Sequence, residues 1–103
     1  MKYSCNIDVL KGVEKMPVIS MFYGIVVRMY RELGGKHKEP HIHVAYAGEE
    51  VVVSLAGVIM EGNIPKHKMK LLEAWMEIHR EELIADWEML SAGEQCYKIE
   101  PLR

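Results

Sequence analysis

Three of the five histidines lie within one short segment, His37-Lys38-Glu39-Pro40-His41-Ile42-His43. Imidazole titrates near neutral pH and binds borderline metals in its neutral form, so it serves both acid–base chemistry and metal binding. On a β-strand, the Cα atoms of His41 and His43 would lie roughly 7 Å apart, since each residue advances a strand by about 3.3 Å. Both rings could then contact one metal ion or one phosphate, with His37 folding back from the preceding loop as a third contact.

The same segment has a simpler interpretation, which stays open at this stage. Histidines on the solvent face of a strand are often only surface residues or part of a partner interface. A metal site built on His37, His41 and His43 is the weaker alternative, because no carboxylate or cysteine stands at a zinc-motif spacing. The sequence therefore predicts no metal site, and no cofactor motif such as a glycine-rich phosphate loop is present.

Three further charged residues are candidates for binding. Lys66 and Lys70 lie at the predicted start of a helix, where free backbone N–H groups attract phosphate. Glu81 follows Arg80 and could form an ion pair with a histidine. A charged helix face usually only keeps a protein soluble, so these residues are secondary candidates beside the histidines.

The elements that must position these residues begin with a small sheet. Segments rich in β-branched and aromatic residues, bounded by turn residues, cover residues 18–30, 41–46, 50–55 and 58–60. Successive strand side chains point to opposite faces, so Ile42 and Val44 should face the core. His41 and His43 should then project side by side from the face that no helix covers.

Helix follows from Pro65 to Ala92, either as one long helix or as two with a break near residues 80–82. Apolar and aromatic residues recur there at steps of three or four, which predicts one buried face. Trp75 and Trp87 on this face are interpreted as core anchors, and His79 as a hydrogen-bonded histidine at the core boundary. The predicted class is α+β: a small, mainly antiparallel sheet of three or four strands, with one face covered by the C-terminal helices.

Bulk properties narrow the classes of protein that fit. At 103 residues, half of them hydrophobic, residues 16–103 are expected to form a single domain, with 1–15 as a leader or disordered extension. A net charge of -2 excludes a global basic field for nucleic acid, although a local patch is compatible with it. The chain has no apolar run of membrane-spanning length and no Cys-x-x-Cys pair. A cytoplasmic protein without membrane contact is expected.

Several stretches resemble one prokaryotic family, the domain of unknown function DUF4160. The segment His37-x-x-Pro40-His41-x-His43-Val44 is similar to that family's most recognisable motif. Residues 16–30, the stretch 79–83 with Trp87, and residues 98–102 also resemble the family. Lys38-Glu39 departs from the Asn-Pro that is usual there, which makes this loop more charged and less rigid.

The resemblance implies a role in a two-protein system, since such proteins are often encoded beside a second small domain, DUF2442, and are regarded as toxin–antitoxin components. The leading hypothesis is one half of such a module, whose partner is that small neighbouring protein or an RNA. A sharper version is an RNA-cleaving toxin: His41 and His43 act as general base and acid, assisted by His37, and Arg28 steadies the phosphate. A non-catalytic protein- or nucleic-acid-binding module is the alternative. Both an enzyme and a binding protein therefore fit, and a homodimer is compatible with either.

Overall fold

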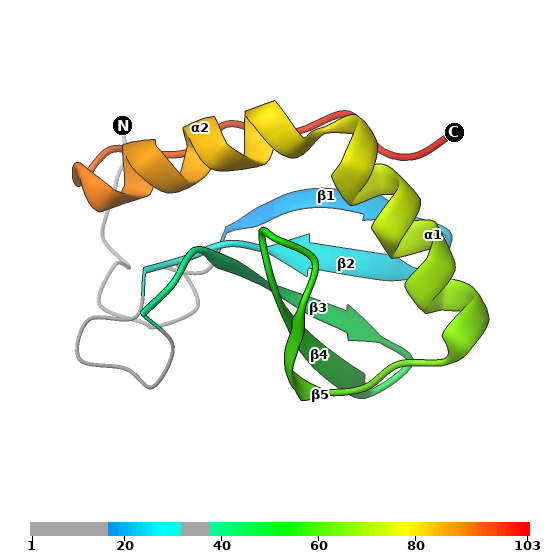
Figure 1. Cartoon of the computed structure of the whole chain (residues 1–103). Helices are drawn as coiled ribbons and strands as arrows, with labels where there is room; N and C mark the ends of the chain where they lie inside the picture. The colour runs from blue at the N-terminus through cyan, green and yellow to red at the C-terminus, as the bar shows by residue number, and fades with distance from the viewer. Residues whose placement is uncertain (1–16, 32–37) are drawn as a thin grey trace.

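The computed structural model describes residues 17–31 and 38–103 (Figure 1). Within them, antiparallel strands form one sheet in the order β1-β2-β3-β4-β5, and two helices follow. The elements are β1 (Val18–Phe22), β2 (Ile25–Arg28), β3 (His41–Tyr46), β4 (Glu49–Ser54), β5 (Ile59–Gly62), α1 (Lys66–Ile78) and α2 (Arg80–Ser91). The predicted α+β class is confirmed, with five strands in place of three or four. The expected leader, residues 1–15, lies outside the described residues.

Two tight turns explain how so short a chain forms so many strands. Tyr23 and Gly24 join β1 to β2 with φ angles of 51° and 81°, and Ala47 and Gly48 join β3 to β4 with 49° and 85°. Two-residue turns with positive φ at both positions match the right-handed twist of the strands that they connect. The β-rich segment 18–30 is therefore a hairpin, which accounts for the additional strand.

One hydrophobic core lies between the sheet and the helices. Ile42 and Val44 of β3 are buried in it, as the alternation of strand side chains predicted. From α1, Trp75 is completely buried, and its ring centroid lies 5.2 Å from that of Phe22 in β1. Figure 1 shows the two helices forming a layer along the sheet, with α2 continuing toward the end at which β3 begins.

The helical segment divides at His79, which leaves the helical conformation with φ -110° and ψ 25°. Its backbone still bridges the two helices: its N–H donates to the carbonyl of Trp75, and its carbonyl accepts from Leu83 N–H. Two helices are thus present, with the break next to the predicted position. Across residues 17–31 and 38–103, no helix combines the length and the apolar character needed to cross a bilayer.

The C-terminal segment, residues 94–103, runs back along β1 and contacts both the sheet and the helices. Ile99 N–H donates to the carbonyl of Ile19 over 2.8 Å, and the Trp75 indole N–H donates to the carbonyl of Glu100 over 2.8 Å. Nearer to α2, Tyr97 N–H donates to Asp86 Oδ1 over 3.0 Å. These contacts hold the last residues of the chain against the rest of the fold.

Candidate functional site

The histidine pair lies on β3, as predicted, with both imidazoles on one face of the sheet. The ring centroids of His41 and His43 are 5.0 Å apart, and the rings meet edge to face at 67°. The predicted proximity of the two imidazoles is therefore confirmed. What the pair can do depends on how each ring is surrounded.

His41 is completely buried, with 0 % of its surface exposed, so its predicted projection from an open face is wrong. The physical reason is α2, which brings Trp87 to a ring-centroid distance of 5.3 Å from His41. His41 Nδ1 lies 2.6 Å from the carbonyl oxygen of Glu39. Because a carbonyl only accepts, Nδ1 carries the proton and donates it, which fixes the orientation of the ring.

His43 is half-buried and stacks on Tyr30, with ring centroids 4.2 Å apart and planes inclined by 16°. The Tyr30 hydroxyl lies 3.2 Å from His43 Nδ1. The sequence interpretation missed Tyr30 as a neighbour of the pair. Its place two residues after Arg28, in phase with the same face, is the signal that could have found it.

Arg28 is the cross-strand partner of His43 in the register of β2 and β3, and it is half-buried. The sheet thus brings together three of the four residues proposed for catalysis, namely Arg28, His41 and His43. The fourth, His37, lies outside the described residues, so the three-histidine arrangement stays a prediction. In the part of the chain that the structure describes, no three His, Cys, Asp or Glu side chains come together as a metal site would require.

The three candidates for binding lie elsewhere. Lys66 and Lys70 are exposed on the first turns of α1, at the far side of the molecule from the start of β3 (Figure 1). Glu81 is exposed in the first turn of α2. The structure therefore does not join these three residues and the histidine pair into one site.

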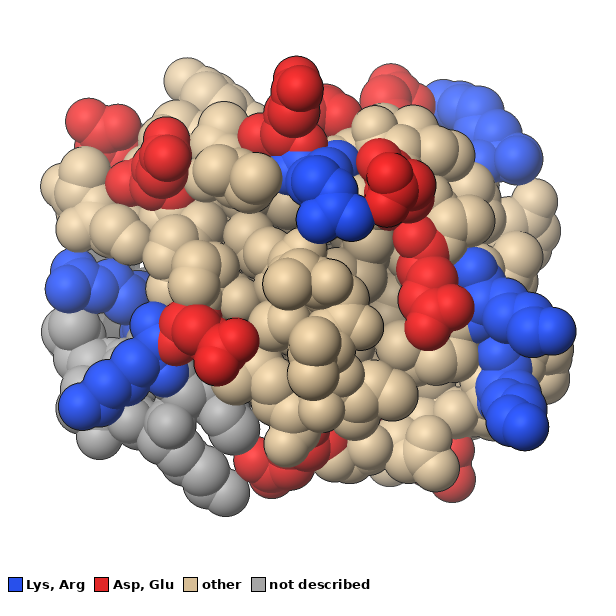
Figure 2. Space-filling model, viewed as in Figure 1, with Lys and Arg blue, Asp and Glu red and all other residues tan. Residues whose placement is uncertain are grey.

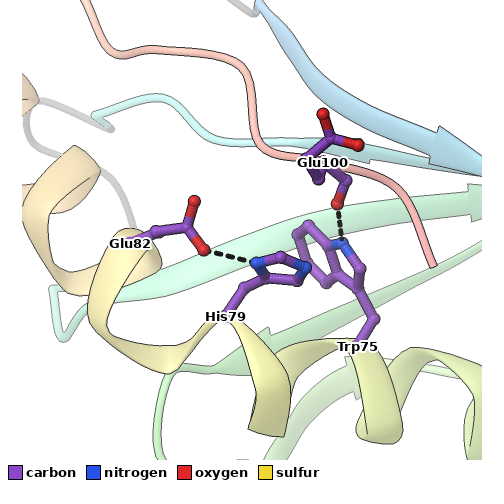
Figure 3. Close-up of polar contacts among 4 residues, drawn as sticks. All are labelled: Trp75, His79, Glu82 and Glu100. Atoms are coloured by element: carbon purple, nitrogen blue, oxygen red, sulfur yellow. Dashed lines mark hydrogen bonds and ion pairs between the residues drawn. The ribbon is translucent and has the colours of Figure 1, made fainter.

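A second polar cluster, drawn in Figure 3, surrounds the break between the helices. The ring of His79 lies beside Trp75, with centroids 5.7 Å apart, and its Nδ1 contacts the Glu82 carboxylate. The Trp75 indole points to the backbone of Glu100 on the other side. His79 is therefore the hydrogen-bonded boundary histidine that the sequence predicted.

Asp86 is a buried acid that the sequence interpretation did not single out. It is 3 % exposed, and within the described residues its Oδ2 has no hydrogen-bond partner. Burial raises the pKa of Asp86, the hydrogen bond from Tyr97 N–H opposes this, and the nearby Glu82 charge raises it further. Its place three residues after the buried Leu83, on the same helix face, is the signal that could have found it.

Cys96 is buried beside this acid. Its pKa is raised by burial first and by the Asp86 charge second. A thiol with a raised pKa holds little of the thiolate that reacts. Cys96 is therefore assigned to the core packing of the C-terminal segment.

Comparison with known proteins adds one match. A family model described as Domain of unknown function (DUF4160) matches residues 24–88, which run from the first hairpin turn into α2 and include the histidine segment. No curated protein and no solved structure matches the chain.

Proposed function

The chain belongs to the DUF4160 family of unknown function, and we propose that it is the binding half of a two-protein, toxin–antitoxin-like module. In this proposal it contacts a small partner protein encoded nearby and neutralises that protein. It does not cleave RNA.

One observation carries the choice between binding and cleavage: His41 has no exposed surface. A general base or acid must come within hydrogen-bond reach of the proton that it moves, about 2.6–3.2 Å between heavy atoms. His41 instead donates from Nδ1 to the carbonyl of Glu39 and packs against Trp87. The arrangement favours a structural role for His41 in holding β3 and α2 together.

Exposed apolar side chains at one edge of the sheet support binding. Val58 and Ile59 lie where β5 begins and are 61 % and 46 % exposed, and β5 is the edge strand of the sheet among the residues that the structure describes. An edge strand can accept a strand from another chain through backbone hydrogen bonds, while exposed side chains supply apolar contact. A surface of this kind suits a protein partner better than a phosphate backbone.

The proposed setting is the cytoplasm. Cys96 is a free cysteine, which is compatible with the reducing conditions of the cytoplasm. No step of the proposal requires a metal or a cofactor.

Growth measurements test this proposal. The chain and its His43→Ala variant are induced in a bacterial host, each with and without the neighbouring gene. We expect unchanged growth with either form alone, slowed growth with the neighbouring gene alone, and restored growth when the wild-type chain is co-expressed.

Two outcomes would contradict the proposal. Arrest by this chain alone that disappears in His43→Ala would favour the RNA-cleaving alternative. If neither gene slows growth, the toxin–antitoxin part of the proposal is wrong.

A further inference from the structure

A shallow groove lies where α2 crosses the turn after β4. Its apolar lining comes from Pro40, Leu55, Ala56, Ile84 and Trp87, and its volume is about 360 Å³. That volume is at the small end of the range for ligand pockets. The groove suits an anchoring side chain of a larger partner better than it suits an enclosed small molecule.

The helical layer beside the groove is strongly acidic. Between Leu71 and Tyr97 the chain has a single basic residue, Arg80, and seven acidic ones. The acidic residues are the buried Asp86 and six exposed glutamates, Glu73, Glu77, Glu81, Glu82, Glu88 and Glu94. Figure 2 shows an uncharged area in the middle of this face, with acidic side chains gathered along its upper part, where the helices lie.

The one basic residue does not cancel this charge at the groove. Arg80 donates to the Glu77 carboxylate over 2.7 Å and to the carbonyl of Leu55 over 3.2 Å, so its guanidinium is engaged within the fold. Glu88 lines the groove and is exposed. It makes no ion pair with any residue that the structure describes. Arg80 and Glu88 both line the groove, and Glu77 offsets the charge of Arg80, so the rim of the apolar floor carries a net negative charge.

We propose that this groove binds a basic amphipathic segment of a partner protein. An apolar side chain of that segment would rest between Ile84 and Trp87, and its lysines or arginines would face Glu88. The same charge repels phosphate, which disfavours RNA at this surface. The inference rests on the proposed function, and it names the surface and the chemistry of the partner.

The groove can be tested by nuclear magnetic resonance, because the chain has only two tryptophans. Trp87 lines the groove, and the buried Trp75 serves as an internal reference. The probe is a synthetic amphipathic helix of leucine and lysine, titrated into the full-length chain. Two controls are titrated in the same way: a peptide of leucine and glutamate, and a single-stranded RNA oligonucleotide.

We expect the leucine–lysine peptide to cause a saturable shift of the Trp87 indole N–H signal. The leucine–glutamate peptide and the RNA oligonucleotide should not cause this shift. The matched variants are Ile84→Ser and Ile78→Ser, since both isoleucines are exposed on helices, at 42 % and 66 %, and only Ile84 lines the groove. Ile84→Ser should weaken binding at least tenfold. Ile78→Ser should leave the affinity unchanged.

Glu88→Lys and Glu73→Lys separate the charge from the apolar contact. Both glutamates are exposed on helices, and only Glu88 lines the groove. Glu88→Lys should weaken binding of the leucine–lysine peptide several-fold more than Glu73→Lys does.

Four results would overturn the inference: an equal response to the glutamate peptide, an equal response to RNA, equal effects of Ile84→Ser and Ile78→Ser, or self-association that Ile84→Ser abolishes. These results do not depend on the growth measurements. The peptide can fail to bind the groove while the chain still neutralises its partner. The experiments therefore distinguish a failure of the groove inference from a failure of the proposed function.

Discussion

At the scale of single residues, two histidines separated by one position have different environments. His41 is enclosed by Trp87 and committed through Nδ1 to a backbone carbonyl, whereas His43 is half-buried against Tyr30. Enclosure matters because a ring without access to substrate cannot exchange protons with it. His41 is therefore assigned to stability.

Alanine substitution of each histidine measures how much its side chain contributes to the free energy of unfolding. His41→Ala should lower the free energy of unfolding by about 2–4 kcal/mol, because it leaves a cavity and leaves the Glu39 carbonyl without its donor. His43→Ala should cost about 1 kcal/mol, since part of its side chain already meets solvent. Urea unfolding of both variants provides the comparison, and an equal loss in the two would argue against the structural assignment of His41.

The buried acid predicts a dependence of stability on pH. Because the pKa of Asp86 is raised in the fold, the folded state holds that proton more readily than the unfolded state does. Ionised Asp86 therefore weakens the fold at neutral pH, and this penalty shrinks as the pH falls through the raised pKa. Asp86→Asn should stabilise the chain more, relative to wild type, at pH 7 than near pH 4.

Unfolding in urea at several pH values checks this prediction. The other acids are the same in both proteins, so the difference in unfolding free energy between variant and wild type isolates Asp86. A difference that stays constant with pH would show that Asp86 ionises in the fold as it does in the unfolded chain.

At this scale, the sequence predicted that the two imidazoles would be neighbours, because strand alternation alone decides it. It could not predict the burial of His41, which depends on Trp87, a residue 46 positions later on another element. It missed Asp86 for a related reason. An acid on a helix is usually exposed. The helical spacing from Leu83 places Asp86 on the buried face, and the structure shows the contact with Tyr97 N–H that accompanies its burial.

At the scale of elements, β4 and β5 approach closely at a glycine. Gly62 has φ 78°, and a Cβ atom there would lie 2.2 Å from the backbone oxygen of Glu50. Gly48 has a similar φ of 85°, but a Cβ atom there would have no neighbour within 4 Å. Substitution at Gly48 therefore measures the cost of the backbone conformation alone, and substitution at Gly62 adds the cost of the steric contact.

Alanine at these glycines gives a matched test. Gly48→Ala should cost about 1 kcal/mol, the usual penalty for a left-handed alanine. Gly62→Ala should cost at least about 2 kcal/mol more, because the backbone of β4 or β5 must move and weaken the ladder. Thermal and urea unfolding measure both, and equal losses would mean that the strands are not so closely placed.

The helices show what periodicity can and cannot establish. The steps of three and four predicted the buried face, with Leu72, Trp75 and Leu83 in the core. They left open whether the helix is continuous, because the pattern passes through His79 without interruption. The structure places the break at His79, whose ring contacts Glu82 of α2 on one side and Trp75 of α1 on the other.

At the scale of the whole molecule, the fold separates positive from negative charge along its length. Lysines gather at the start of α1, acids gather along the later helical layer, and the histidine pair lies at the end of the sheet that α2 covers. A net charge of -2 conceals this separation. Composition alone therefore could not predict the acidic helical face, which is the basis on which we propose a basic partner.

The central claim is that this chain binds a partner and does not cleave RNA. Its most direct test is incubation of the purified full-length wild-type chain and its His43→Ala variant with labelled RNA of mixed sequence. Both proteins should leave the RNA as intact as buffer alone does. Cleavage by the wild-type chain that is lost in a folded His43→Ala variant would contradict the account.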